Sequence, residues 1–187
     1  AYIQTEESGF VLALTVPFNP AGSTHHVNFF TTKDSRWETD PRKCPVNYAI
    51  LDSGWEGEFC RVVESHPKVL RYVKNQGLGL EVPYTYQGEP HTYVPDFIVW
   101  VDDGRGEADP LQLIVEIKGY RGDAVQAKHQ TIKDYWIPGV NALKAYGRWA
   151  FAEFTDVFEM EEDFANKVAE QWNQIMEQNT APKAEEA

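Results

Sequence analysis

The order of apolar and polar residues along the chain predicts a domain that mixes strands and helices. Runs rich in β-branched and aromatic residues, bounded by Gly, Pro and Asn, predict strands at 10–18, 27–32, 78–86, 92–101, 111–118 and 149–155. Apolar residues at helical spacing predict helices at 53–64, 68–74, 124–136, 141–146 and 161–177, with a stop near Pro138-Gly139. The order from residue 51 onward predicts an α/β fold, with helices flanking a central mixed sheet.

The helix at 53–64 has the clearest start signal. Ser53 stands at the N-cap position and Glu56 follows three residues later, which is the spacing of a capping box. Four apolar residues then recur on one side of the helix and predict its buried face: Trp55, Phe59, Val62 and Val63.

The chain divides into three parts. Residues 1–50 predict a β-rich N-terminal extension, residues 51–178 the main domain, and residues 179–187 a disordered acidic tail. Because the sequence begins with Ala1 rather than Met, we expect it to be a piece of a longer protein.

Composition narrows the functional classes. A net charge of −12 argues against a nonspecific binder of polyanions, since phosphate binding normally leaves a basic footprint. No apolar run is long enough to span a membrane, and no secretory segment is present. Cys44 and Cys60 match no metal spacing and predict buried free thiols. We therefore expect a cytoplasmic protein with no membrane partner.

Two charged residues interrupt the apolar strand at 111–118. Glu116 and Lys118 lie two residues apart, so both side chains point to one face while Val115 and Ile117 point to the other. A symmetric hairpin centred on residue 106 places Asp96 opposite Glu116, at about 5 Å between Cβ atoms. Like charges this close destabilise a ladder, and one lysine cannot neutralise both.

A divalent cation is therefore the expected partner of Asp96 and Glu116. Hard carboxylate oxygens that leave positions open to water and phosphate suit Mg²⁺ or Mn²⁺ better than Zn²⁺. Such an ion beside an ammonium group favours the hydrolysis of phosphodiesters.

These residues resemble the PD-(D/E)xK nuclease signature, with Pro95-Asp96 followed by Glu116-Ile117-Lys118. A longer set of segments resembles the C-terminal endonuclease region of the Res subunit of type III restriction enzymes, over roughly residues 45–155. The segments are DSGWE (52–56), YVKN (72–75), VPY (82–84), VPDFIV (94–99), VEIKG (115–119), YWIPGVN (135–141) and GRWAF (147–151). The resemblance implies a restriction-endonuclease-like αβββαβ core and Mg²⁺-dependent cleavage of double-stranded DNA. It also implies that Asp96 and Glu116 bind the metal and that Lys118 is the catalytic lysine.

The resemblance also implies partners. Res subunits carry a helicase-like ATPase, yet this sequence has no GxxxxGK[ST] loop, so ATP would act only through an upstream domain. Recognition of the DNA sequence would belong to a methyltransferase (Mod) subunit. A stand-alone repair or resolvase-type nuclease of the same superfamily, or a catalytically silent DNA-binding or assembly domain, remain the alternatives.

Several further residues have two interpretations. Glu56 is either a third metal ligand, as acidic residues on the first core helix are in many such nucleases, or the helix cap alone. Lys128 and Lys133, together with Arg121, lie in a locally basic segment and would contact DNA phosphates. Lys128 would otherwise assist at the active site, and a solvated helix face explains the lysines equally well.

The distribution of charge changes the first impression. Residues 153–187 hold ten acidic and two basic residues, a balance of −8, whereas residues 1–152 carry only −4. We therefore expect weak intrinsic DNA affinity, and not the absence of a DNA substrate.

Overall fold

A four-stranded mixed sheet forms the centre of the protein in the computed structural model, which describes residues 2–6, 9–13, 24, 27–117 and 123–180. The sheet order is β10-β9-β8-β5. β8 pairs antiparallel with both β5 and β9, while β10 runs parallel to β9. The strands are β5 (Val69–Lys74), β8 (Phe97–Val101), β9 (Leu111–Ile117) and β10 (Arg148–Phe154). The prediction of an α/β fold with a central mixed sheet is confirmed.

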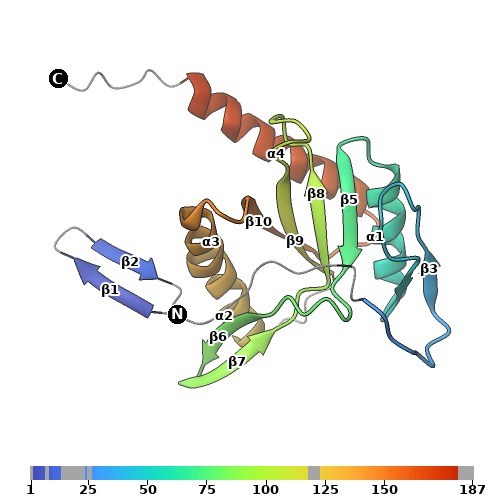
Figure 1. Ribbon diagram of the computed structural model, residues 1–187, viewed down its shortest axis with the longest axis horizontal. Helices are drawn as coiled ribbons and strands as arrows, with labels where there is room; N and C mark the ends of the chain where they lie inside the picture. The colour runs from blue at the N-terminus through green and yellow to red at the C-terminus, as the bar shows by residue number, and fades with distance from the viewer. Residues whose placement is uncertain (1, 7–8, 14–23, 25–26, 118–122, 181–187) are drawn as a thin grey trace.

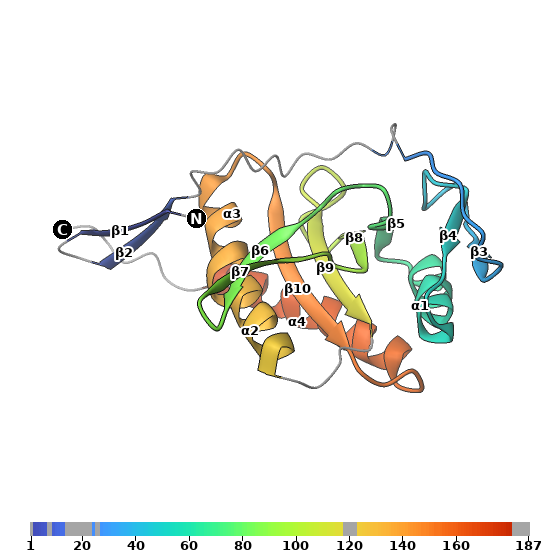
Figure 2. The ribbon, with the colours of Figure 1, turned by 90° about the horizontal axis from the view of Figure 1, so that it is seen from below.

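Helices cover both faces of this sheet (Figures 1 and 2). Helices α1 (Gly54–Ser65) and α4 (Met160–Thr180) pack on one face. The other face carries a continuous helical segment that connects β9 to β10. This segment consists of α2 (Asp123–Thr131), the π-helical turn η2 (Ile132–Trp136) and α3 (Ile137–Leu143).

The alternation of side chains along each strand separates two apolar clusters. Odd-numbered residues of β8 and β9 pack with Phe59 of α1 and with Phe154 and Phe164. Even-numbered residues of the same strands, such as Ile98 and Ile114, pack with η2 and α3. Because successive residues point to opposite faces, these strands must be apolar on both sides except where function intervenes.

The start of α1 follows the predicted cap. Ser53 has extended backbone angles and its Oγ accepts the N–H of Glu56 at 3.4 Å. The Glu56 carboxylate reaches back to the N–H of Asp52 at 2.8 Å, one residue beyond the usual capping box. The predicted helix, including its end before Pro67, is confirmed.

Three short hairpins stand apart from the central sheet. They are β1–β2 (Tyr2–Glu6 and Gly9–Ala13), β3–β4 (Arg36–Glu38 and Tyr48–Ile50) and β6–β7 (Val82–Tyr86 and Glu89–Tyr93). The β6–β7 turn is a tight two-residue turn in which Gln87 and Gly88 both have positive φ angles. The hairpin lies below the central sheet in Figure 1, and the chain continues from β7 through Val94 to Pro95 and Asp96.

The helix predicted at 68–74 is wrong, because this segment is strand β5. Val69, Tyr72 and Val73 are β-branched or aromatic, and the segment is only six residues long. Pairing with β8 buries four of its six residues, including Tyr72 on one face and Val73 on the other, which outweighs the weak helical spacing.

The predicted helix stop at Pro138-Gly139 is also wrong. The chain continues from η2 into α3, where Pro138 occupies one of the first two helical positions. In η2 the N–H of Ile137 bonds to the carbonyl of Ile132 with π-helical spacing. This wider turn shifts the hydrogen-bond frame and accommodates a residue that has no N–H to donate.

Other boundaries also differ from the predictions. Residues 27–32 form no strand, and the run 92–101 is split between β7 and β8 by a bend at Val94-Pro95-Asp96. The strand expected at 78–86 starts only at Val82. The strand predicted at 10–18 corresponds to β2 over residues 10–13, and residues 14–18 lie outside the described residues. Most of the predicted acidic tail, residues 181–187, also lies outside them.

Cys44 and Cys60 are buried free thiols, as expected, and burial raises the pKa of Cys60 to about 12. None of the helices in the described part of the chain has the length and apolar character needed to cross a membrane.

The packing of Phe59 gives the first testable prediction. Phe59 is fully buried between Phe97, Phe154 and Phe164, so Phe59→Ala should lower the free energy of unfolding by about 3–5 kcal/mol. The matched control is Phe158→Ala, because the Phe158 side chain is 95% exposed and its loss should cost less than about 0.5 kcal/mol. Urea unfolding measures both, and similar losses would contradict this core assignment.

Candidate functional site

The register between β8 and β9 places the two predicted carboxylates side by side. The ladder ends with Phe97 paired to Val115, in the register that the symmetric hairpin predicted, and Asp96 and Glu116 are the next residues beyond this last pair. Glu116 lies on the α2 side of the sheet, while Val115 and Ile117 pack on the α1 side. The expected separation of strand faces is therefore confirmed for Glu116.

The Asp96 side chain provides the hydrogen-bond acceptor at the end of the β8–β9 ladder. Its N–H donates to the carbonyl of Val115 at 3.1 Å, and its Oδ2 accepts the N–H of Ile117 at 2.7 Å. Pro95, the residue before it, has no N–H to offer a neighbouring strand. A carboxylate oxygen thus occupies a position where a sheet normally has a backbone carbonyl, and this fixes Asp96 against β9.

Glu116 is 8% exposed and is held by two further elements. Lys128 of α2 donates to its Oε1 at 2.7 Å, and the phenol of Tyr93 at the end of β7 donates to its Oε2. The Lys128 ammonium also lies 4.3 Å from the centre of the Tyr93 ring. Burial and the neighbouring Glu116 charge raise the pKa of Tyr93, which keeps this donor protonated. Lys128 therefore faces the carboxylates and not the solvent.

The environment of Asp96 disfavours its ionised form. Burial, followed by the charge of Glu116, raises the pKa of Asp96 to about 7, and Glu56 adds to this effect. The hydrogen bond from Ile117 and the charge of Lys74 act in the opposite direction but do not compensate. A carboxyl group with a pKa this high is typical of functional sites, where burial and like charge are tolerated for chemistry.

Glu56 belongs to a second ionic cluster on the α1 side. Lys74, at the end of β5, donates to Glu56 Oε2 at 2.5 Å, to Asp52 Oδ2 at 2.8 Å and to the carbonyl of Ile50 at 2.6 Å. Burial alone would lower the pKa of Lys74, but the hydrogen bonds that its ammonium donates to Asp52 and Glu56 outweigh the effect of burial and raise the pKa. The structure gives Glu56 a cap contact and a buried ion pair, while its metal role stays a prediction.

Glu153 extends the carboxylate row onto the edge strand. It pairs in register with Glu116, and its Oε2 lies 3.3 Å from Nδ1 of His129 on α2. Burial lowers the pKa of His129, although the Glu153 charge opposes this shift. Sequence reasoning missed Glu153, Tyr93 and Lys74, because each reaches the site only through strand pairing or the β6–β7 hairpin.

The donor set fits a hard divalent cation held by few protein ligands. No group of three or more His, Cys, Asp or Glu side chains in the described ranges is arranged to hold an ion. Mg²⁺, however, keeps several waters and commonly binds through one or two carboxylates plus substrate phosphates. Asp96 and Glu116 provide two such carboxylates in register, at a point where their mutual repulsion is unrelieved for Asp96.

The remaining predicted residues are less constrained. Lys118 and Arg121 lie outside the described residues, so their roles stay predictions. Lys133 is exposed on η2, with its ammonium 5.4 Å from the centre of the Phe151 ring, and is free to contact phosphate.

The raised pKa of Asp96 predicts a pH-dependent effect of Asp96→Asn. The folded parent protein keeps this proton between about pH 4 and 7 and loses it above, so its stability falls as pH rises through that window. In EDTA at pH 8 the variant should be more stable by roughly 2 kcal/mol, or 4–8 °C in Tm, and at pH 5 by less than half as much. Asn retains the acceptor for Ile117, and thermal unfolding at both pH values measures the effect. An equal shift at both would contradict the burial of a charged Asp96.

Glu56→Gln separates the two interpretations of Glu56. If the ion pair with Lys74 is its main role, the variant should lose roughly 2–4 kcal/mol of stability, because a buried ammonium loses its closest partner. Glu58→Gln is the matched control, since Glu58 is a partly exposed residue of the same helix that pairs with Arg61. Unchanged Tm together with lost Mg²⁺ binding by calorimetry would instead assign Glu56 to the metal.

Comparisons with known proteins leave the geometry to carry the functional argument. No family model, no curated protein and no solved structure matches the chain.

Proposed function

We propose that the chain is a metal-dependent endonuclease domain that hydrolyses phosphodiester bonds of double-stranded DNA. The observation that carries this proposal is that Asp96 and Glu116 lie together just beyond the last pair of β8 and β9, where burial and the Glu116 charge raise the pKa of Asp96 to about 7. Two carboxylates this close repel each other when both are ionised, and a bound cation would relieve that repulsion. The PD-(D/E)xK resemblance of the same residues supports the assignment.

Asp96 and Glu116 would hold Mg²⁺ or Mn²⁺. Such an ion supplies polarisation of a phosphoryl oxygen and a lower pKa for a bound water. The chain's own residues prepare the site: Ile117 N–H orients Asp96, and Tyr93 with Lys128 orients Glu116. Lys118, two residues beyond Glu116, is the proposed catalytic lysine, and cleavage would leave a 5′-phosphate as the resemblance implies.

The distribution of charge allows DNA to reach this side of the sheet. Lys128 and Lys133 lie on the helical segment beside Glu116. The strongly acidic helix α4 packs on the opposite face, so its charge lies behind the sheet as seen from the carboxylates. Phosphates would approach from the α2 side, with Lys133 and Arg121 as proposed contacts.

The finer assignment is to a type III restriction Res subunit. Helix α1, strands β5, β8 and β9, the α2–α3 segment and β10 follow the αβββαβ order of the restriction-endonuclease-like core, which supports it. On this proposal the protein works in the cytoplasm with an upstream helicase-like ATPase, which uses ATP, and with a Mod subunit that recognises the DNA. A stand-alone nuclease of the same superfamily would share the site without these partners.

A catalytically silent DNA-binding or assembly domain is the second candidate. The observation in its favour is that Lys128 and Tyr93 already satisfy both oxygens of Glu116 without a metal. The two candidates differ in whether a cation competes with Lys128 for this carboxylate.

Plasmid nicking by the chain tests the proposal. Mg²⁺ or Mn²⁺ should support nicking that EDTA abolishes, and Asp96→Asn, Glu116→Gln and Lys118→Ala should each reduce the rate by about 100-fold or more. Lys167→Ala is the matched control, because Lys167 lies on α4 and pairs only with Glu170 at the surface in the described structure. Nicking by all three site variants at the parental rate would refute the assigned site. Metal binding without nicking would favour the silent domain.

A further inference from the structure

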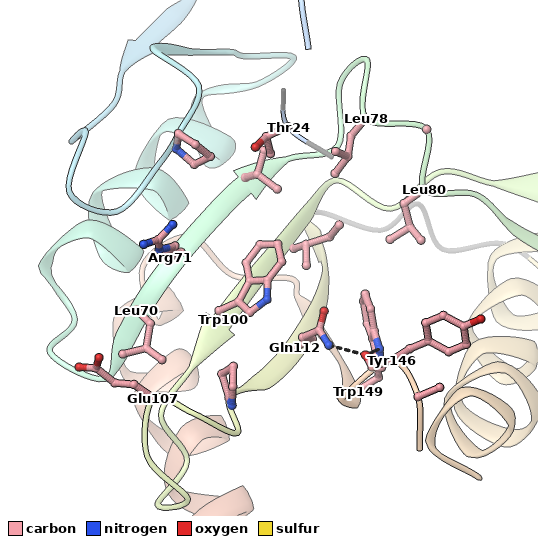
Figure 3. A pocket seen from close by; sticks show the side chains of 16 residues that line it. Thr24, Leu70, Arg71, Leu78, Leu80, Trp100, Glu107, Gln112, Tyr146 and Trp149 are labelled. Carbon is pink, nitrogen blue, oxygen red and sulfur yellow. Dashed lines mark hydrogen bonds between the residues drawn. The ribbon is translucent and has the colours of Figure 1, made fainter. Parts of the chain in front are cut away.

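A cavity of about 840 Å³ opens on the same sheet face as Glu116, toward the opposite ends of the strands (Figure 3). Its volume falls in the range of sites that bind small molecules and cofactors. Side chains from all four strands reach it, and the loops at 78–80 and 145–146 form its border. None of the residues assigned to the carboxylate site lines it.

One cross-strand row forms the floor of this cavity. Arg71 of β5 pairs with Trp100 of β8, Trp100 pairs with Gln112 of β9, and Gln112 pairs with Trp149 of β10. Residues paired across a sheet point to the same face, so a cation, an indole, an amide and a second indole stand in line. Arg71 and Gln112 are polar interruptions of a face that is otherwise covered by apolar and aromatic packing.

The Gln112 amide has a fixed orientation. Its Nε2 donates to the carbonyl of Tyr146 at 2.7 Å, drawn as the dashed line in Figure 3, and Nε1 of Trp149 donates to the same oxygen at 2.9 Å. Gly147 leaves room for the amide, since a Cβ there would lie 2.5 Å from Gln112 Nε2. Within the described chain no group donates to Oε1, so the amide offers the cavity a free acceptor.

Arg71 provides the positive charge of the cavity. Its side chain is exposed, and no carboxylate of the described residues pairs with it. It lies two strands from Gln112, at about 10 Å by strand spacing. A planar ring on Trp100 would therefore have a hydrogen-bond acceptor on one side and a guanidinium on the other.

We propose that this cavity binds a single unpaired nucleotide. The base stacks on Trp100, an exocyclic amino group donates to Gln112 Oε1, and the phosphate pairs with Arg71. An exocyclic amino group can donate to Oε1 without a second acceptor beside it, whereas the N3–H of thymine lies between two carbonyl oxygens that repel Oε1, so bases with an amino group are favoured over thymine. An apolar ligand would leave the Gln112 acceptor unpaired, and a ligand without negative charge would not use Arg71.

The proposal rests on the proposed function in that the nucleotide belongs to DNA. Gln112 and Glu116 are four residues apart on one strand face, so the cavity lies roughly 13 Å from the carboxylates. The buried residues Ile98 and Ile114 separate the two places. The cavity would thus hold a base taken out of the duplex near the position of cleavage, and it is distinct from the place where the bond is broken.

Calorimetric titration of the chain with dAMP and dTMP in EDTA tests the nucleotide site without metal or cleavage. We expect dAMP to bind at least about 5-fold more tightly than dTMP, the effect of one hydrogen bond. Arg71→Ala should weaken dAMP binding by about 5- to 10-fold through loss of a charge-assisted contact. Gln112→Leu should abolish the preference for dAMP. Glu107→Gln should strengthen binding, because Glu107 is the acidic residue that lines the cavity.

Arg36→Ala is the matched control. Arg36 is also an exposed strand arginine beside an aromatic ring, 5.2 Å from the Tyr48 centroid, but it does not line the cavity. Arg36→Ala should leave dAMP affinity unchanged within about 2-fold, which is the usual size of effect for a surface substitution away from a site. The absence of saturable dAMP binding would overturn the proposal. So would parental dAMP affinity in Arg71→Ala together with an unchanged preference for dAMP over dTMP in Gln112→Leu. Saturable binding by a protein that fails to nick DNA would instead refute the nuclease function alone.

Discussion

The antiparallel register of β8 and β9 determines where almost every functional group lies. Pairing of Phe97 with Val115 sets Asp96 against Glu116 at one end of the strands and Trp100 against Gln112 at the other. A shift of one residue would turn all of these side chains to the α1 face and bury polar groups in an apolar cluster. The apolar residues that alternate with them, such as Val99 and Leu113, make that alternative costly, because they fill the α1 side completely.

The price of this register is electrostatic. Burial and the Glu116 charge raise the pKa of Asp96. Two lysine ammonium groups, one on each side of the sheet, partly compensate the buried negative charge. Lys128 approaches from α2 and Lys74 from β5, each bonded to a buried carboxylate. Glu116 is compensated within the chain, whereas the carboxylate of Asp96 has only the Ile117 N–H as a bonded partner among the described groups. The Asp96 carboxylate is therefore the less compensated of the two.

The sequence contained enough information for the central pair but not for its surroundings. Hairpin symmetry about residue 106 predicts the register of β8 and β9, and strand alternation predicts the face of Glu116, because both rules are local to one β-hairpin. The Ser53 cap is likewise local and correct. Strand β5 was missed because its pairing with β8 spans about 25 residues and includes the separate β6–β7 hairpin. Tyr93 was missed for the same reason, since only that hairpin brings it to Glu116.

The helical connection shows a different limit. Pro138 normally ends a helix, and that rule failed because a π-helical turn precedes it. Such a turn depends on packing of Ile132 and Trp136 against the sheet, which no local propensity encodes. Since Lys128 and His129 lie one turn before η2, their approach to Glu116 and Glu153 depends on this same packing.

The α2 face of the sheet carries three cross-strand rows that differ in polarity. A polar and aromatic row from Arg71 to Trp149 stands at one end, and the acidic row with Asp96, Glu116 and Glu153 at the other. Between them one row is fully apolar and buried: Val73, Ile98, Ile114 and Phe151. An apolar row excludes water and holds the strands in register, so the two outer rows keep a fixed spacing of roughly 13 Å. Polar groups in the central row would be buried without partners and would destabilise the sheet. The outer rows lie at the ends of the strands, where polar groups can still reach solvent or a ligand.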